Sequence, residues 1–216
     1  MLTKEQLRIL NVFGLDIFAS QTFKQIKEHS KQKSNNIVQI ALKEFQKQEI
    51  VQTKAIGNII TYQLNLGSNL TLSYLEVLNQ LNLTKKFFPK NILQEIQIKI
   101  SNYTDFFILI VFGSYAKGKA TENSDLDIAV IVESEQTKKE ITPFLETTKR
   151  REIKPIDYHV FTRSEYLEML EADAENLGKQ IYKNNMIYYG FIQYCNLIRR
   201  RKHEWPSRII PTKSRK

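Results

Sequence analysis

Apolar residues in the first fifty positions recur at helical intervals. The first such series consists of Leu7, Leu10, Phe13 and Ile17. Thr3 and Gln6, just before Leu7, have the spacing of a capping box, which predicts that a helix begins after Thr3. A second helix is expected after Ser20, with Phe23 and Ile26 inward, and a third of about a dozen residues after the polar stretch HSKQKSNN. The apolar positions of the third helix are Ile37, Ile40, Ala41, Leu42 and Phe45.

Two short stretches with strand character follow, at residues 50–54 and 59–64. The sequence AIGN joins them, and Gly57-Asn58 can supply the positive φ of a hairpin turn. Three helices followed by a hairpin is the order of a winged helix-turn-helix domain, which we expect over residues 1–66. Residues 67–89 are predicted to form a linker with a helix from about 71 to 81, and Pro89 ends it.

From residue 90 onward, the pattern predicts alternating strands and helices. A helix at about 91–102 precedes strands at 106–112, 125–132 and about 155–161, and a helix at about 135–151 separates the last two; only helices are expected afterwards. This order indicates a second domain over residues 90–198. The apolar run FFILIVF has the length of a buried strand, well short of the roughly 20 residues of a membrane-spanning helix.

The net charge of +9 is concentrated at the ends of the chain. Residues 199–216 form a basic tail with eight Lys or Arg against one acid, whereas the centre is slightly acidic. This distribution suits a protein that contacts nucleic acid at its ends, and a solubilising terminus is the equal alternative for the tail. With a single cysteine, Cys195, which we expect to be small and buried, and no signal-peptide pattern, a cytoplasmic protein without a membrane partner is expected.

The stretch FFILIVFGSYAKGKATENSDLDIAVIVE carries the candidate chemistry. An apolar strand runs directly into Gly113-Ser114, where glycine allows close approach of the backbone and the serine hydroxyl and loop N–H groups can donate to a phosphate. Gly118 follows in the same polar loop, and Lys117 and Lys119 add positive charge.

Three aspartates are the candidate metal ligands and catalytic residues. Asp125 and Asp127 are separated by one residue, so strand alternation places both on one face. Two adjacent carboxylates repel by about 1 kcal/mol at 4 Å in water, and roughly four times that near a protein surface, unless a cation lies between them. Asp157, within the apolar stretch after Pro155, is the expected third carboxylate, as a metal ligand or a proton acceptor.

The segment GSYAKGKATENSDLDIAV resembles the signature of the polymerase-β-type nucleotidyltransferase superfamily in its minimal form, Gly-Ser, ten residues, then Asp-x-Asp. The resemblance covers about residues 90–165. It implies that Gly113 and Ser114 hold nucleotide phosphates with Lys117 and Gly118 beside them, and that Asp125, Asp127 and Asp157 bind two Mg²⁺ ions, for which Mn²⁺ can substitute. Lys117 stands where arginine is common, which keeps the charge but loses bidentate phosphate binding.

The sequence therefore favours an α+β protein, with a winged helix-turn-helix domain before a polymerase-β-like domain whose mixed sheet is flanked by helices. The expected reaction transfers a nucleoside monophosphate, with AMP preferred, from an NTP to a hydroxyl on a protein or nucleic acid and releases pyrophosphate. The alternative is a DNA-binding transcriptional regulator whose transferase-like domain senses nucleotide. A second copy of the chain, in a homodimer, is a further candidate partner.

The third predicted helix is the candidate DNA-binding element, since a recognition helix enters the major groove. Its expected contacts are Lys31, Lys33, Ser34, Asn35, Asn36, Gln39 and Lys43, with Lys54 on the wing. A protein-docking or dimerising role is the competing interpretation. His159 shares a strand face with Asp157, although a core or edge histidine is favoured. The aromatic residues Tyr182, Tyr188, Tyr189, Phe191 and Tyr194 predict a terminal helix packed on the sheet.

Overall fold

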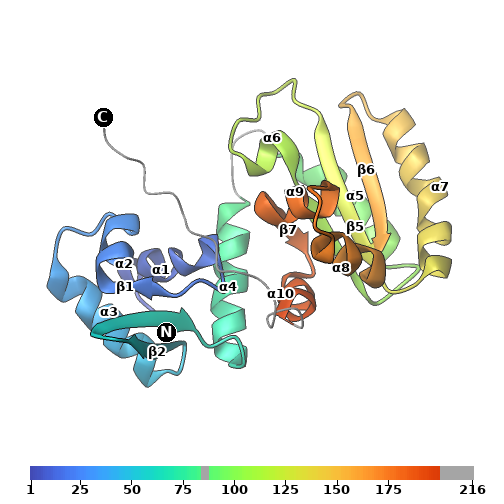
Figure 1. The fold of residues 1–216 in the computed structure, drawn as a ribbon. Coiled ribbons are helices and arrows are strands. Elements are labelled where there is room, and N and C mark those ends of the chain that lie inside the picture. Colours follow the sequence, from blue (N-terminus) through green and yellow to red (C-terminus); the bar gives the residue numbers. More distant parts are fainter. Residues whose placement is uncertain (84–87, 200–216) are drawn as a thin grey trace. The chain divides into compact units, whose positions relative to one another are not determined.

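The computed structural model describes residues 1–83 and 88–199 (Figure 1). The chain divides into two compact units between Leu78 and Asn79, and each unit has a sheet of its own. The predicted domain limits at residues 66 and 89 stay predictions. Apart from Arg199, the predicted basic tail lies outside the described residues. No described helix is both long enough and apolar enough to cross a membrane.

The first unit is built from short helices and one small antiparallel sheet. Its elements are α1 (Lys4–Leu10), η1 (Phe13–Leu15), β1 (Gln21–Thr22), α2 (Phe23–His29), α3 (Asn35–Lys47), β2 (Val51–Ile56) and β3 (Ile59–Leu64). The predicted capping box of Thr3 and Gln6 is present, and Thr22 with Gln25 forms a second one at α2. The sheet order is β1-β3-β2, and Gly57 turns the β2–β3 hairpin with φ of 58°. These elements have the order expected of a winged helix, and that assignment stays a prediction.

The buried face of α3 differs from the simple list of its apolar residues. Val38, Ala41, Leu42 and Phe45 are buried. Ile37 and Ile40, by contrast, are 40% and 54% exposed. The 3.6-residue period explains the difference, because residues 37 and 40 lie about one residue out of phase with 38, 41, 42 and 45. The solvent face of α3 therefore carries two isoleucines among polar side chains.

The second unit has a four-stranded mixed sheet flanked by helices, which confirms the α+β prediction. The division falls inside α4 (Asn69–Asn82), and the elements that follow are α5 (Lys90–Ile100), β4 (Phe107–Val111), α6 (Gly113–Ala116), β5 (Leu126–Val132), α7 (Glu135–Arg151), β6 (Ile156–Thr162), α8 (Arg163–Glu171), α9 (Leu177–Lys183), β7 (Met186–Tyr189) and α10 (Phe191–Arg199). The strand order is β6-β5-β4-β7, in which β5 and β6 are parallel and the other pairs antiparallel.

Strand β7 corrects the expectation that only helices follow residue 161. Tyr188 and Tyr189 lie on this strand, which pairs antiparallel with β4, rather than on a terminal helix. Tyr189 stacks on Phe107 with ring centroids 4.4 Å apart. Four residues are too few to show a clear alternation in the sequence, so only the pairing with β4 defines the strand. Helix α10 follows and buries Tyr194 and, as expected, Cys195.

The two faces of this sheet have different surroundings. Phe107, Leu109 and Val111 of β4 and the even-numbered residues of β5 pack in one cluster with apolar side chains of α5 and α7. Because side chains alternate along a strand, Asp127 projects from the opposite face. The alternation thus separates the packed core from the carboxylate.

Candidate active site

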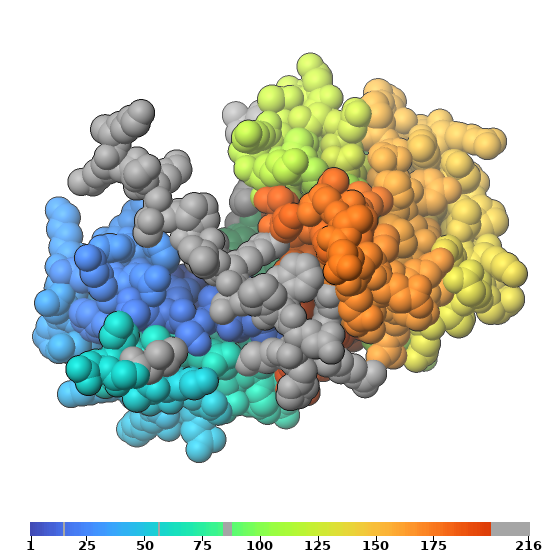
Figure 2. All heavy atoms as spheres, in the orientation of Figure 1, coloured from blue at the N-terminus to red at the C-terminus, as the bar shows by residue number. Residues whose placement is uncertain are grey.

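The Gly113–Asp125 segment connects β4 to β5 and passes the ends of β5 and β6 where these strands begin (Figure 1). It starts with α6, a single helical turn where the sequence predicted a loop. Lys154 holds the far side of the segment, since its Nζ donates to the carbonyl oxygens of Glu122 at 2.7 Å and Ser124 at 3.1 Å. In the space-filling view, this segment forms the surface beside β6 (Figure 2).

Gly113 lies directly against the carboxylate of Asp127. Its φ is 62°, and a Cβ at this position would come within 1.8 Å of Asp127 Oδ2. The N–H of Ser114 hydrogen-bonds to the same carboxylate. The Gly-Ser pair therefore lies against Asp127, a contact that the sequence did not reveal, and its predicted role in phosphate binding stays a prediction.

Asp127 and Asp157 are direct partners in the β5–β6 register. The pKa of Asp127 is raised, first because the carboxyl is partly desolvated and then because of the negative charges of Asp157 and Asp125. The Ser114 N–H and His159 oppose this rise of the pKa. Asp125 is exposed and immediately precedes β5. The structure thus brings the three predicted aspartates close enough to interact.

Asp157 is more exposed than its register partner Asp127, with 56% of its side chain exposed. His159 Nε2 lies 3.3 Å from Asp157 Oδ2, and Lys149 Nζ of α7 lies 3.8 Å from Oδ1. His159 is thus an edge-strand histidine in contact with the site. Lys149 was not among the expected site residues, and nothing in the local sequence indicates it, because it approaches from a different helix.

The carboxylates fit a divalent cation that also binds phosphate. Within residues 1–83 and 88–199, no group of three or more His, Cys, Asp and Glu side chains is arranged to hold a metal ion by itself. Mg²⁺ in phosphoryl-transfer sites is commonly held by one or two carboxylates together with substrate phosphates and water. The pKa of Asp127 is raised first by partial burial and then by the negative charges of Asp157 and Asp125, and a bound cation would offset both effects. The oxygens present therefore suit a divalent cation whose remaining ligands are phosphate oxygens and water.

The remaining predicted nucleotide-binding residues lie at the exposed side of the segment. Lys117, Gly118 and Lys119 are all exposed, and Lys117 forms the C-cap of α6. Gly118 has a φ of 68°, and a Cβ there would meet no atom within 4 Å. This part of the segment is accessible to a phosphate, in contrast to the close packing at Gly113.

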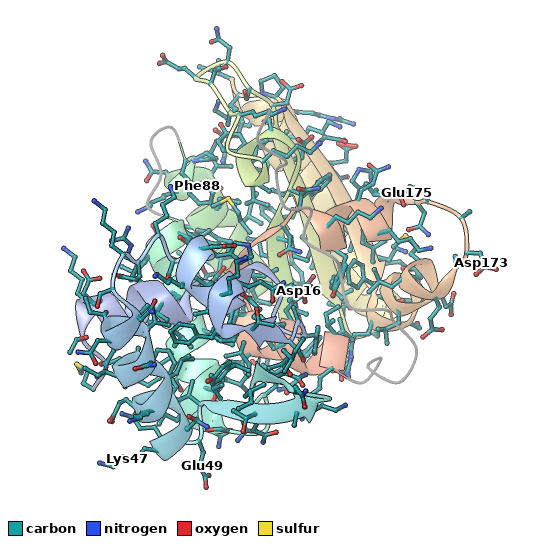
Figure 3. The ribbon with its side chains drawn as sticks, turned by 60° about the vertical axis from the view of Figure 1, so that its left-hand side comes forward. Asp16, Lys47, Glu49, Phe88, Asp173 and Glu175 are labelled. Carbon is teal, nitrogen blue, oxygen red and sulfur yellow. The ribbon has the colours of Figure 1, made fainter. Side chains whose placement is uncertain are left out.

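The predicted DNA contacts in the first unit gather at the start and on the solvent face of α3. Lys31 has a φ of 55° before the helix, and Ser34 is its N-cap residue. Ser34 is half-buried, and the other predicted contacts are all exposed: Lys31, Lys33, Asn35, Asn36, Gln39 and Lys43. Lys27 Nζ already donates to Asn35 Oδ1 at 2.6 Å. The exposed Lys47, at the end of the helix in Figure 3, extends the same face and was missed, although its spacing of four from Lys43 was a usable signal.

Residues 94–187 match the model of the protein family described as Polymerase beta, Nucleotidyltransferase. This match supports a nucleotidyltransferase domain over the segment that contains β4, β5, β6 and the three aspartates. No curated protein and no solved structure matches the chain.

Proposed function

We propose that this chain is a Mg²⁺-dependent nucleotidyltransferase that transfers a nucleoside monophosphate, preferentially AMP, from an NTP to a hydroxyl acceptor. The observation that carries the proposal is the position of Asp127, which faces Asp157 across β5 and β6 and is held by Gly113 and Ser114. The family match over residues 94–187 supports nucleotidyl transfer in general.

The proposed roles follow from where each side chain lies. Asp125 and Asp127 hold the metal ion that accompanies the triphosphate, because both lie beside the Gly113–Gly118 segment. Asp157 serves the acceptor side, where it binds the second ion or receives the proton of the attacking hydroxyl. Bound Mg²⁺ supplies charge neutralisation at the phosphates and lowers the pKa of the attacking hydroxyl. Lys117 and Lys119 attract the triphosphate as exposed point charges.

The test uses the full chain, each of the four NTPs labelled at the α-phosphate, and a cell lysate as the source of acceptor. Transfer of label and release of pyrophosphate are expected with Mg²⁺ or Mn²⁺ and not with EDTA. Asp125→Ala and Asp127→Ala should each abolish transfer while the circular dichroism spectrum stays that of the folded protein. Full transfer by either variant would end the catalytic assignment.

The second candidate function is DNA binding by the first unit. In this alternative, the protein is a transcriptional regulator whose transferase-like domain senses nucleotide and does not act as an enzyme. Its support is the exposed set Lys31, Lys33, Lys43 and Lys47 around the solvent face of α3. Binding without turnover distinguishes the regulator from the enzyme, because only an enzyme releases pyrophosphate.

A further inference from the structure

Three aromatic rings extend from the carboxylates along the same face of the second sheet. The Phe112 and His159 ring centroids are 6.1 Å apart, and those of His159 and Phe161 are also 6.1 Å apart with nearly parallel planes at 5°. His159 and Phe161 follow Asp157 at intervals of two on β6, so they share its face. Phe112 is joined to the same level of the sheet, since its N–H donates to the carbonyl oxygen of Asp127 at 3.0 Å.

The residues that carry these rings are partly exposed, whereas Tyr115, an aromatic residue in the Gly113–Asp125 segment, is buried. Phe112, His159 and Phe161 are all half-buried, and 35% of the His159 side chain is exposed. Tyr115, only three residues from Phe112, is buried in the core cluster. Phe112 and His159 are thus partly exposed residues that lie within one or two positions of Gly113 and Asp157, where the reacting groups are proposed to meet.

We propose that Phe112 and His159, supported by Phe161, form an aromatic platform that binds a nucleobase beside the carboxylates. Every nucleobase has a flat π-face, and stacking on a protein aromatic ring contributes about 5- to 150-fold in affinity. The surrounding charge favours a nucleobase over the aromatic side chain of a protein substrate. Lys117 and Lys119 are exposed on the adjoining segment and Lys149 contacts Asp157, so cations are present for the phosphates that accompany a base.

The inference deepens the proposed nucleotidyl transfer, on which it rests, and the base can come from two sources. It belongs either to the NTP donor or to the terminal nucleotide of a nucleic-acid acceptor. Both present the same planar ring to the platform. The experiment therefore measures binding to a representative of each source and does not depend on turnover.

Calorimetric titration of the full chain compares ligands that differ only in the base. For the donor, MgATP is compared with magnesium ribose 5′-triphosphate. For the acceptor, a single-stranded adenine tetranucleotide is compared with the same backbone lacking bases. Phe112→Ala and His159→Ala test the platform, and His159→Phe keeps a ring but loses the contact with Asp157. Tyr103→Ala removes a ring that is 48% exposed elsewhere in the second unit and is the matched control.

The alanine variants should each lower the preference for the base-containing ligand by about tenfold, while His159→Phe and Tyr103→Ala should stay within about twofold of the original protein. Loss confined to MgATP assigns the platform to the donor, and loss confined to the tetranucleotide assigns it to the acceptor. If the alanine variants keep the preference for the base in both ligand pairs, the proposal is overturned. Binding of a protein side chain by these rings would give the same result. If the original protein binds neither MgATP nor magnesium ribose 5′-triphosphate, the proposed transfer fails instead, and the tetranucleotide comparison alone decides the platform.

Discussion

The solvent face of α3 and the carboxylate site differ in how many parts of the chain build them. Apart from Lys31, Lys33 and the N-cap Ser34, the α3 surface comes from one helix of 13 residues. The carboxylate site combines Gly113 and Ser114, Asp127 on β5, Asp157 and His159 on β6, and Lys149 on α7. Only the helical period is needed to assemble the first, whereas the second depends on strand register.

The two regions also handle charge in opposite ways. On α3, lysines are spread over an exposed face, where water screens their repulsion. At the carboxylates, negative charge is concentrated around a half-buried Asp127 whose pKa is raised. A sheet register shifted by one residue would send Asp157 to the opposite face and remove this concentration. The spread lysines suit an extended polyanion, and the concentrated aspartates suit a small cation.

After the loss of transfer expected for Asp125→Ala and Asp127→Ala, the largest effect is expected from Asp157→Asn, which tests whether the third acid belongs to the acceptor side. The variant keeps the shape of the side chain but loses its charge. Transfer should fall by about 10²–10⁴-fold because the acceptor hydroxyl is no longer activated. MgATP binding should stay within about tenfold, or 1.4 kcal/mol. Calorimetry with a non-hydrolysable ATP analogue and a transfer assay measure the two parameters.

A loss of nucleotide binding in Asp157→Asn, or retained transfer, would show that the third carboxylate is wrongly assigned. Glu152, shortly before β6 at the same end of the sheet, is then the next acid to test, whereas Glu133 follows the far end of β5 and pairs with Arg163.

Gly113→Ala should reduce transfer by about 10²-fold, because the new methyl group occupies the place of Asp127 Oδ2 and displaces the carboxylate. Gly118→Ala is the matched control. Both glycines have positive φ, but nothing lies within 4 Å of the added carbon at Gly118. That variant should show only the backbone cost, about 1 kcal/mol in urea unfolding, with transfer reduced less than tenfold. Equal losses of transfer in the two variants would mean that the contact with Asp127 is unimportant.

Lys33→Ala combined with Lys43→Ala tests the α3 surface as a DNA contact. Each neutralised phosphate contributes a slope of about −0.9 to log K against log salt, so the double variant should flatten the slope by roughly two units. Fluorescence anisotropy with a duplex over a salt series measures it. Lys90→Ala with Lys139→Ala removes two exposed lysines of the second unit and should leave the slope unchanged. Equal flattening by both pairs would make the effect one of overall charge.

The smallest effect concerns the stability of the metal-free protein. Because the pKa of Asp127 is raised in the folded state, its protonated form favours folding, and that contribution is lost as pH rises through the folded pKa. At pH 7 without metal, Asp127→Asn should therefore be more stable by about 0.3–1 kcal/mol, discounted for partial exposure, or about 1–3 °C in Tm. The gain should vanish as pH falls below the ordinary value of 3.8.

Thermal unfolding of Asp127→Asn between pH 3.5 and 8 measures this gain, with Asp125→Asn, at an exposed position, as the control for the loss of one charge. A variant less stable than the original protein at pH 7 would show that the hydrogen bond from Ser114 outweighs the repulsion among the carboxylates.

Much of the second unit could be predicted from local sequence patterns. Helix α7 has the predicted bounds, and β4, β5 and β6 lie within one residue of the predicted strands, because apolar runs and helical periods are strong signals over five or more residues. The capping box at Thr3 was equally local. The Gly-Ser and Asp-x-Asp motif identified the residues of the candidate site for the same reason.

Other features appear only when distant segments pair. Strand β7 exists through its pairing with β4, and the approach of Lys149 to Asp157 depends on where α7 packs beside β6. The sequence by itself determined which residues form the motif and which face of β5 carries Asp127. The tertiary structure decided that Asp127 faces Asp157, that Gly113 and Ser114 hold it, and that three rings continue from it. The physical reason is that alternation and helical period are properties of a single segment, whereas register and close contact depend on the packing of several segments.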